Sequence, residues 1–394
     1  MKASWLLMSA ALALAGGCSS LKFNEVASLP ATSQQGLKTL TMTSPQQIGN
    51  YDVTLTFGDP FKPTVNWVKF EGRRVALMAI ETGPGEMKSE TFTARVKGPV
   101  ARDDDTTGES PYPSSLNVTV VTSADRVLPP EVERNDAARV IYLCGDATVA
   151  DAQAEPWGGW GQCLPLFFRP GTAVANFAGP GQTVQSFLQH RRLDRVLARL
   201  KVGDLVLLQF GRNDLKTPSL APYGGFQEKL NACLDKIHSR GARAILITPL
   251  EPCEAGVRGP QRGRMLADYV QAMREVAEQR GVDLIDLNGA SARLYETVGA
   301  NAARSLFAVA STETLRRDFP DDPAVRGLHD TSHTSIYGAY VFAHYIADEL
   351  VKRCPEFKKS RRAGFEAASL ARLEPDPAIP PSGRFDATCP ECYD

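Results

Sequence analysis

Four short polar segments hold the side chains that are best suited to chemistry in this sequence. They are 144–148 (CGDAT), 176–183 (NFAGPGQT), 211–214 (GRND) and 330–333 (DTSH). Each contains glycine, asparagine, aspartate or histidine where strand propensity does not call for them. Histidine and carboxylates are the group types for proton transfer, and a carboxamide and glycine-rich turns can donate hydrogen bonds to a developing negative charge.

The elements that must position these segments are short buried strands that alternate with amphipathic helices. Apolar runs predict strands at 139–144, 173–177, 204–210, 243–248 and 282–287, and helical periodicity predicts helices at 184–200, 226–239, 261–280 and 336–353. Five strands with crossover helices predict a parallel sheet that is covered on both faces. Ligands of such sheets bind beyond the carboxyl ends of the strands, where three of the four polar segments fall.

The part of the chain before this alternation has a different pattern of apolar residues. Apolar residues alternate at 51–57, 92–96 and 116–120, and apolar β-branched runs occupy 65–70 and 75–80. Short strands between Gly, Pro and Asp clusters predict a small antiparallel β-sandwich, with 102–115 as a solvated loop and 127–137 as a linker. We therefore expect a sandwich and linker at 21–134, an α/β domain at 135–355, and an irregular, loosely packed tail at 356–394.

The first 20 residues indicate export. One Lys precedes an apolar stretch of about 11 residues, the length of a secretory signal core. Ala15, Gly16 and Gly17 before Cys18 resemble a bacterial lipobox, which predicts lipidation of Cys18, and plain secretion is the alternative. We therefore expect an exported bacterial lipoprotein. Its lipid would anchor it to a membrane, in the periplasm or at the cell surface.

Composition excludes several other classes. Of 394 residues, 43% are hydrophobic and 23% charged, which is typical of a folded protein. The net charge of −1 gives no global field that would attract nucleic acid, and no apolar run reaches the length of a membrane span. Cys389 and Cys392 favour a local disulfide, or a pairing of one of them with Cys354, over a zinc site.

The segments YLCGDATVAD, EPWGGWGQ, VANFAGPGQTVQSF, GDLVLLQFGRND and DTSHTSIYGAY, spread over 139–353, resemble the SGNH (GDSL-type) hydrolase superfamily and its rhamnogalacturonan acetylesterase branch. The preceding sandwich is similar to an N-terminal accessory domain of bacterial members. The resemblance implies a three-layer, doubly wound, flavodoxin-like fold with a five-stranded parallel sheet. It implies no cofactor and no metal, and the histidines lack ligand spacing.

The resemblance also implies roles for individual residues. His333 is the base, and Asp330 holds its imidazole in the right tautomer. The oxyanion donors are the backbone N–H groups of residues 147 and Gly181 and the side-chain amide of Asn213. Asp146 and Asp214 are supporting residues. Trp157, Trp160 and Arg212 are candidate contacts to the substrate. Core packing is the alternative for the two tryptophans, and Arg212 departs from the His that is common in this branch.

The main departure lies at Ala147, where the family carries the nucleophilic serine of its G-D-S signature. Alanine cannot form an acyl-enzyme. Thr148 lies one residue along a tight turn and Cys144 lies on the strand before it, so neither is expected to replace the serine. Two explanations stay open: a family esterase whose nucleophile was replaced, or a natural non-catalytic relative. Because the other site residues are all in place, we favour the first.

The expected function is therefore that of a carbohydrate esterase scaffold, inactive or nearly so, whose partner is an acetylated rhamnogalacturonan- or pectin-like polysaccharide. Two alternatives remain. One is a lipid-anchored, non-catalytic glycan-binding protein, and the other is an esterase that acts on a small acyl ester.

Overall fold

The computed structural model describes residues 24–28, 36–97, 115–253, 260–318, 325–365, 367–368, 372–373 and 376–381. Its centre is a five-stranded parallel sheet in the order β10-β9-β11-β12-β13. The strands are β9 (Arg139–Gly145), β10 (Thr172–Asn176), β11 (Leu205–Gln209), β12 (Arg243–Ile247) and β13 (Asp283–Ile285). All five lie within a residue or two of their predicted positions, and the order is that of a doubly wound, flavodoxin-like sheet.

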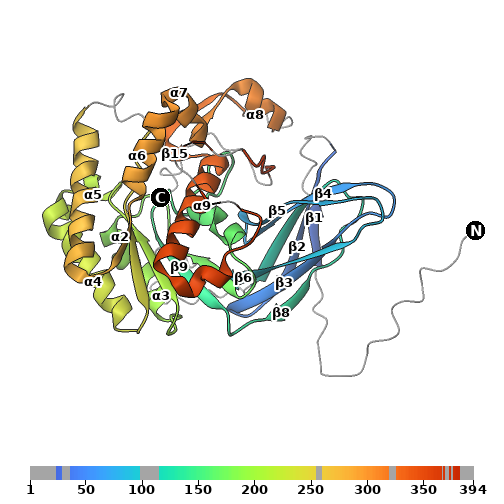
Figure 1. The fold of residues 1–394 in the computed structure, drawn as a ribbon, viewed down its shortest axis with the longest axis horizontal. Helices are drawn as coiled ribbons and strands as arrows, with labels where there is room; N and C mark the ends of the chain where they lie inside the picture. Colours follow the sequence, from blue (N-terminus) through green and yellow to red (C-terminus); the bar gives the residue numbers. More distant parts are fainter. Residues whose placement is uncertain are drawn as a thin grey trace, which may run out of the picture.

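Helices cover both faces of this sheet, because successive side chains of each strand point to opposite sides. Ile141 and Leu143 belong to the core beneath α6 (Leu287–Val298) and α9 (Ile336–Arg353). Val140 and Tyr142 belong to the core on the other face, beneath α2 (Val184–Gln189), α3 (Arg192–Leu197), α4 (Gln227–His238) and α5 (Pro260–Arg280). Figure 1 shows the sheet between the two groups of helices. The predicted three-layer architecture is confirmed.

One predicted helix is broken. The periodicity over 184–200 indicates a single helix, but α2 and α3 are separate, and Arg191 between them has a φ of 54°. The left-handed conformation of one residue ends the first helix and turns the chain into the second.

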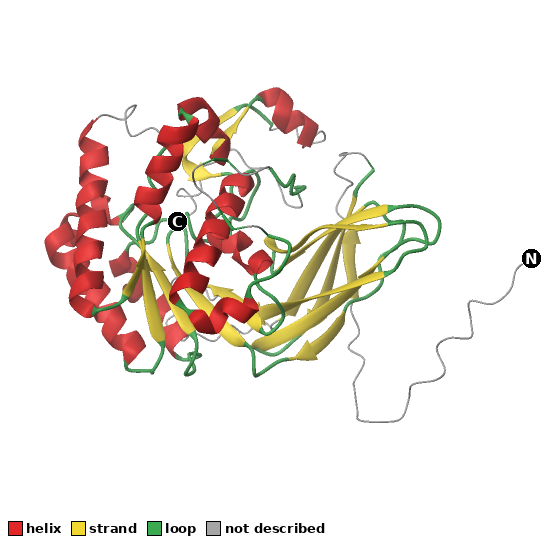
Figure 2. Ribbon diagram, viewed as in Figure 1, coloured by secondary structure: helices red, strands yellow, loops and turns green. Residues whose placement is uncertain are grey.

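The N-terminal region forms two antiparallel sheets around a core of its own, as Figure 2 shows. One sheet has the order β1-β2-β7-β4-β5 and the other β6-β3-β8. The strands are β1 (Asn24–Ser28), β2 (Lys38–Pro45), β3 (Gly49–Phe57), β4 (Thr64–Phe70), β5 (Arg74–Thr82), β6 (Lys88–Val96), β7 (Ser115–Thr122) and β8 (Glu131–Arg134). The strand β8 lies inside the segment expected to be a linker, where it pairs with β3.

A second, smaller antiparallel pair was not predicted. It consists of β14 (Phe307–Ala310) and β15 (Leu328–Thr334), and β15 carries the DTSH segment that the sequence placed in a loop. The remaining described elements are short. They are the helices α1 (Trp160–Cys163), α7 (Ala300–Ala303) and α8 (Thr312–Asp318), and the helical turns η1 (Leu164–Phe167), η2 (Asp214–Lys216), η3 (Pro218–Leu220), η4 (Pro222–Phe226), η5 (Arg304–Leu306) and η6 (Pro355–Ser360).

The described part of the C-terminal segment is packed, so the expectation of a loose tail is wrong there. Phe357 in η6 is buried, and Arg361 forms an ion pair with Asp348. Further along, the carbonyl oxygen of Pro380 accepts a hydrogen bond of 2.6 Å from the buried Nζ of Lys69 in β4. The segment therefore ties the end of the chain to the N-terminal sheets.

Several expectations lie outside the described residues. They are the signal peptide, lipidation of Cys18, most of the 102–115 loop, and Cys389 and Cys392. Cys354 is a free, buried thiol, so its pairing with a tail cysteine is not observed. Among the helices in the described ranges, none combines the length and apolar character that a bilayer crossing requires.

Candidate active site

The turn after β9 presents Ala147 at the surface of the fold. Asp146 Oδ1 accepts hydrogen bonds from the backbone N–H of Thr148 at 2.9 Å and from its hydroxyl at 2.7 Å. Its carbonyl oxygen accepts from the backbone N–H groups of Val149 and Ala150. Within 145–150, Ala147 alone is not buried. The turn therefore points the side chain of residue 147 away from the sheet.

Neither neighbouring hydroxyl nor thiol can take the place of a serine there. The Thr148 side chain is buried, and its oxygen also accepts a hydrogen bond from the Gln209 amide at the end of β11. Cys144 is fully buried beneath the helices, and burial raises the pKa of its thiol well above the ordinary value. A buried neutral thiol is a poor nucleophile.

Ala147 and His333 line the same pocket, which holds about 480 Å³ including the part that is open to solvent. Most of its wall comes from the segment 150–158, which follows the turn, and Pro180 and Thr334 close it. The complete lining is Ala147, Ala150, Ala152, Gln153, Ala154, Trp157, Gly158, Pro180, His333 and Thr334. Small and apolar side chains predominate, so the space beside the imidazole suits a small apolar group.

The imidazole of His333 is held by Asp330, whose Oδ2 lies 2.8 Å from Nδ1. In a regular strand, residues three apart point to opposite faces and cannot meet. Here the pairing of β15 with β14 jumps from Thr334 opposite Phe307 to Asp330 opposite Ala308. The extra residues form a bulge that folds the chain back, and Asp330 Oδ1 accepts the backbone N–H groups of Ser332 at 2.8 Å and His333 at 3.0 Å.

The Asp330 carboxylate is ionised at all ordinary pH values. Burial acts to raise its pKa, but the hydrogen bonds and charge of His333, the Ser332 backbone and the Trp157 indole lower it to about 2. Trp157 Nε1 donates to Oδ2 at 3.0 Å. Because the carboxylate can only accept, the proton of the neutral imidazole resides on Nδ1, and the ring acts on the pocket through Nε2.

The turn after β10 lies directly beside the first turn. The N–H of Gly179 donates to the carbonyl of Gly145 at 3.0 Å, and the Asn176 amide donates to the carbonyl of Val149 at 2.8 Å. Pro180 lines the pocket, and Gly181 follows it with a φ of 70°. Glycine adopts this left-handed conformation without steric cost. These contacts and the turn at Gly181 bring the backbone of residues 180–181 to the rim of the pocket.

The turn after β11 is fixed by Asp214 and carries Asn213. The Asp214 carboxylate accepts the backbone N–H groups of Val184 and Gly211, both at 2.8 Å. Burial, with a smaller contribution from Asp146, raises the pKa of Asp214 to about 7. Asn213 Nδ2 donates to the carbonyl of Gln182 at 3.3 Å. Asn213 therefore lies beside the turn that contains Gly181 and Gln182.

The three residues expected to contact substrate are placed differently. Trp160 is 1% exposed in the core of the parallel sheet and donates from Nε1 to Gln209 Oε1 at 2.9 Å, so its ring is not available to a sugar. Trp157 lines the pocket but is nearly buried and supports Asp330. Arg212 is 8% exposed and lies outside the pocket lining. Trp160 is thus packed in the core, whereas Trp157 is buried and also lines the pocket.

Three residues support the site in roles that the sequence analysis did not assign, although Asn176 begins one of its polar segments. Asn176 and Gln209 each end a strand and bond to the turn that carries Ala147, and Asp151 accepts the Asn176 amide at 3.0 Å. The sequence signal that could have indicated Asn176 and Gln209 is a single amide side chain at the end of an otherwise apolar strand. In the described ranges, no group of three or more His, Cys, Asp or Glu side chains is arranged to hold a metal ion.

Comparison with known proteins agrees with this geometry. The family model of the GDSL-like Lipase/Acylhydrolase family matches residues 143–329. Rhamnogalacturonan acetylesterase RhgT of Bacillus subtilis (strain 168) is 32% identical over 213 residues, which cover 53% of this chain and 88% of that protein. A rhamnogalacturonan acetylesterase of Emericella nidulans is 26% identical over 203 residues, covering 45% and 78%.

A crystal structure of protein YxiM from Bacillus subtilis aligns with 87% of this chain and 89% of its own, at 22% identity and a TM-score of 0.47. The family match contains all three strand-end segments, 144–148, 176–183 and 211–214, in full, and Asp330 immediately follows it. With the identity and coverage of the Bacillus relative, these findings show that the chain belongs to the GDSL-like lipase/acylhydrolase family, the SGNH hydrolases.

Proposed function

We propose that this chain is the scaffold of a carbohydrate esterase that deacetylates a rhamnogalacturonan- or pectin-like polysaccharide, and that Ala147 leaves it inactive or nearly so. The observation that carries the proposal is the shared pocket of Ala147 and His333, with Asp330 on the far ring nitrogen. The two matched rhamnogalacturonan acetylesterases support the substrate class. The small alanine side chains of the wall suit the methyl of an acetyl group.

The proposed chemistry requires a serine at position 147. Its hydroxyl would attack the ester carbonyl while His333 Nε2 takes the proton, and the same nitrogen would then give that proton to the departing sugar oxygen as the ester C–O bond breaks. A water molecule, deprotonated by Nε2, would then attack the acetyl-enzyme and release acetate, and the proton would return to the serine oxygen. Asp330 would keep the imidazole oriented and stabilise its charged form. The oxyanion would be stabilised by the backbone N–H groups of residues 147 and Gly181 and by the second N–H of the Asn213 amide.

The test is Ala147→Ser, with acetate release measured on acetylated rhamnogalacturonan and on a simple aryl acetate. We expect hydrolysis to rise by up to a factor on the order of 10⁶, because that is what a catalytic serine contributes in comparable hydrolases. The double variant Ala147→Ser/His333→Ala is the matched control and should return to the background rate. A folded Ala147→Ser protein that hydrolyses neither substrate would contradict the proposal, whereas hydrolysis of the aryl acetate alone would indicate a small acyl ester as substrate.

A second candidate is a non-catalytic glycan-binding protein. It is favoured by the alanine methyl in the nucleophile position and by the inward-facing Thr148 hydroxyl, which together leave the turn without a nucleophile. Calorimetric titration of the unmodified chain with acetylated and deacetylated rhamnogalacturonan tests it. Tight binding that is unaffected by His333→Ala, with no activity in Ala147→Ser, would favour binding over hydrolysis.

A further inference from the structure

The guanidinium of Arg73 is the most completely bonded cation at the junction of the N-terminal sheets and the hydrolase fold. Arg73 lies in the turn between β4 and β5 and is 6% exposed. Its Nε donates to Glu155 Oε1 at 3.1 Å, and Nη2 lies 2.5 Å from Oε2. Nη1 donates to the carbonyls of Ala152 at 3.0 Å and Ala154 at 2.6 Å, and Nη2 donates to that of Trp157 at 3.1 Å. All five N–H donors of the side chain are used.

Every one of these acceptors belongs to the segment that forms the pocket wall. Ala150, Ala152, Gln153, Ala154, Trp157 and Gly158 are six of the ten lining residues. The segment 151–158 contains no helix, and its extended pairing is limited to isolated bridge positions such as that of Trp157 with Ser335. A wall without its own ladder of hydrogen bonds depends on its neighbours for its shape. Arg73 satisfies three of its carbonyl groups from the other region of the molecule.

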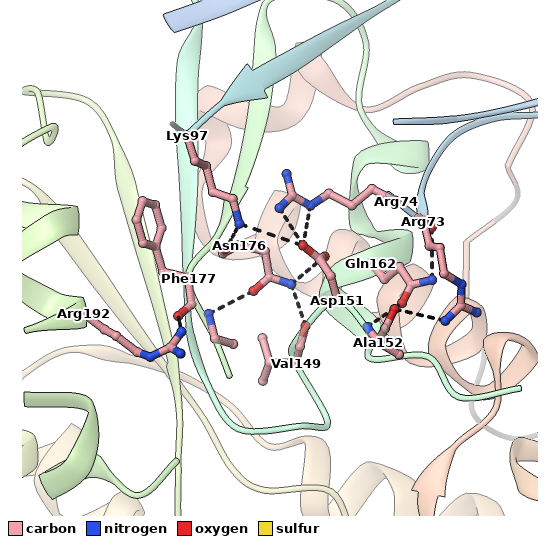
Figure 3. A network of polar contacts seen from close by, with 11 residues as sticks. Arg73, Arg74, Lys97, Val149, Asp151, Ala152, Gln162, Asn176, Phe177 and Arg192 are labelled. Carbon is pink, nitrogen blue, oxygen red and sulfur yellow. Dashed lines mark hydrogen bonds and ion pairs between the residues drawn. The ribbon is translucent and has the colours of Figure 1, made fainter. Parts of the chain in front are cut away.

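A second set of contacts fixes the start of the same segment, as Figure 3 shows. Arg74 donates to Asp151 Oδ2 through Nε at 2.8 Å and Nη2 at 2.5 Å, and Lys97 Nζ lies 3.9 Å from the same oxygen. The backbone carbonyl of Arg73 accepts from Gln162 Nε2, and Gln162 Oε1 accepts from the N–H of Ala152, both at 3.0 Å. The three cations that bond to the segment 151–158, Arg73, Arg74 and Lys97, all come from the N-terminal region.

The segment in turn holds the histidine–aspartate pair. Trp157, whose carbonyl Arg73 binds, donates from its indole to Asp330 Oδ2, the oxygen that contacts His333. The next residue, Gly158, donates its N–H to the carbonyl of Thr334 at 3.0 Å. Two consecutive residues of the wall therefore bond to both sides of His333.

We propose that Arg73 is a positioning residue of the hydrolytic site: it fixes the pocket wall and, through Trp157, the orientation of Asp330 and His333. The N-terminal sheets thereby supply a necessary part of the active site. The inference rests on the proposed function, because the pair it positions is the proposed catalytic pair. Lysine at position 73 would keep the charge but lose the planar fork that reaches three carbonyls and a carboxylate at once.

The kinetic test compares Arg73→Lys with Arg134→Lys, each in the Ala147→Ser protein. Arg134 also lies in the N-terminal sheets, but its ion pair with Asp136 is exposed, and its other contact, with Tyr51, does not involve the wall. We expect Arg73→Lys to lower kcat about 100-fold, because a displacement of about 1 Å of a catalytic group costs that much, while the Arg134→Lys rate stays unchanged. Equal rates for the two variants would overturn the proposal.

A mutant cycle then tests the route. Trp157→Phe cuts the link to Asp330 without touching the Arg73 fork. If Arg73 acts through Trp157, the kcat of Arg73→Lys/Trp157→Phe equals that of Trp157→Phe alone, since coupled residues are non-additive. Full multiplication of the two losses would contradict positioning through Trp157.

A measurement that keeps alanine at position 147 separates this inference from the proposed function. In Arg73→Lys, the indole N–H of Trp157 should exchange with solvent at least about tenfold faster, because the wall opens locally more often. The buried indole of Trp160, bonded to Gln209, is the internal control and should not change. This result would support the inference even if Ala147→Ser proved inactive, and unchanged exchange at Trp157 would overturn it whatever the activity.

Discussion

At the scale of single residues, the site combines a strongly held imidazole, that of His333, with the methyl group of Ala147. Asp330 accepts from His333, Trp157 and two backbone N–H groups, so the orientation of the imidazole does not depend on a serine. The turn that carries Ala147 is equally independent of that side chain, because Asp146 and Thr148 hold it through their own bonds. Restoring the hydroxyl should therefore require no rearrangement of either element.

The prediction at this scale concerns the carboxylate. In the Ala147→Ser protein, Asp330→Asn should lower kcat about 10⁴-fold, because an amide favours the wrong imidazole tautomer and no longer stabilises the imidazolium. Steady-state kinetics on an aryl acetate measures the loss, with circular dichroism to show that the fold persists. A loss below tenfold would mean that Asp330 is only a structural cap of the bulge in β15.

At the scale of elements, the sequence was informative where burial alone decides the structure. The five parallel strands are apolar on both faces, so their positions followed from apolar runs. The turns at the ends of three of them carry Ala147, Gly181 and Asn213, of which Ala147 lines the pocket. The elements that depend on a partner were missed. β8 exists because β3 pairs with it, and the polar strand β15 exists because β14 does. Nor did the sequence show that a bulge brings Asp330 to His333.

Asp214 gives a prediction for the turns at the strand ends, which it joins by accepting N–H groups from Gly211 and Val184. Its folded pKa of about 7 lies above the ordinary value of 3.8. The unfolded chain therefore ionises first, and the stability this group contributes is complete below about pH 4 and is lost as pH rises through 7. The slope approaches 1.4 kcal/mol per pH unit within that window.

Asp214→Asn should remove this slope, since the amide does not titrate. Urea denaturation of both proteins at pH values from 4 to 8 measures it. The comparison uses the difference in slope, because the amide also changes one hydrogen bond at every pH. Parallel profiles for the two proteins would show that Asp214 ionises normally in the fold.

At the scale of the whole molecule, the sequence predicts two separate regions and a loose tail, whereas the structure joins all three. Val75 of β5 belongs to the same core as Trp160, Phe167 and the helix α9. Arg73, Arg74 and Lys97 reach the wall segment, and Lys69 binds the carbonyl of Pro380. The sequence cannot reveal such contacts between regions. A cation on a strand finds its partners only when the fold brings backbone carbonyls from distant parts of the chain next to it.

This joint predicts that the N-terminal sheets and the hydrolase fold unfold together. The Arg73–Glu155 pair is buried at their boundary, and breaking such a pair costs about 3–5 kcal/mol because one charge stays uncompensated. Scanning calorimetry should give one transition for the described core, and Glu155→Gln should shift that whole transition to lower temperature. A chain that begins at residue 135 should melt lower still, because it exposes the core that Val75 covers. Two resolved transitions, with only one of them moved by Glu155→Gln, would instead make the N-terminal sheets an independent domain.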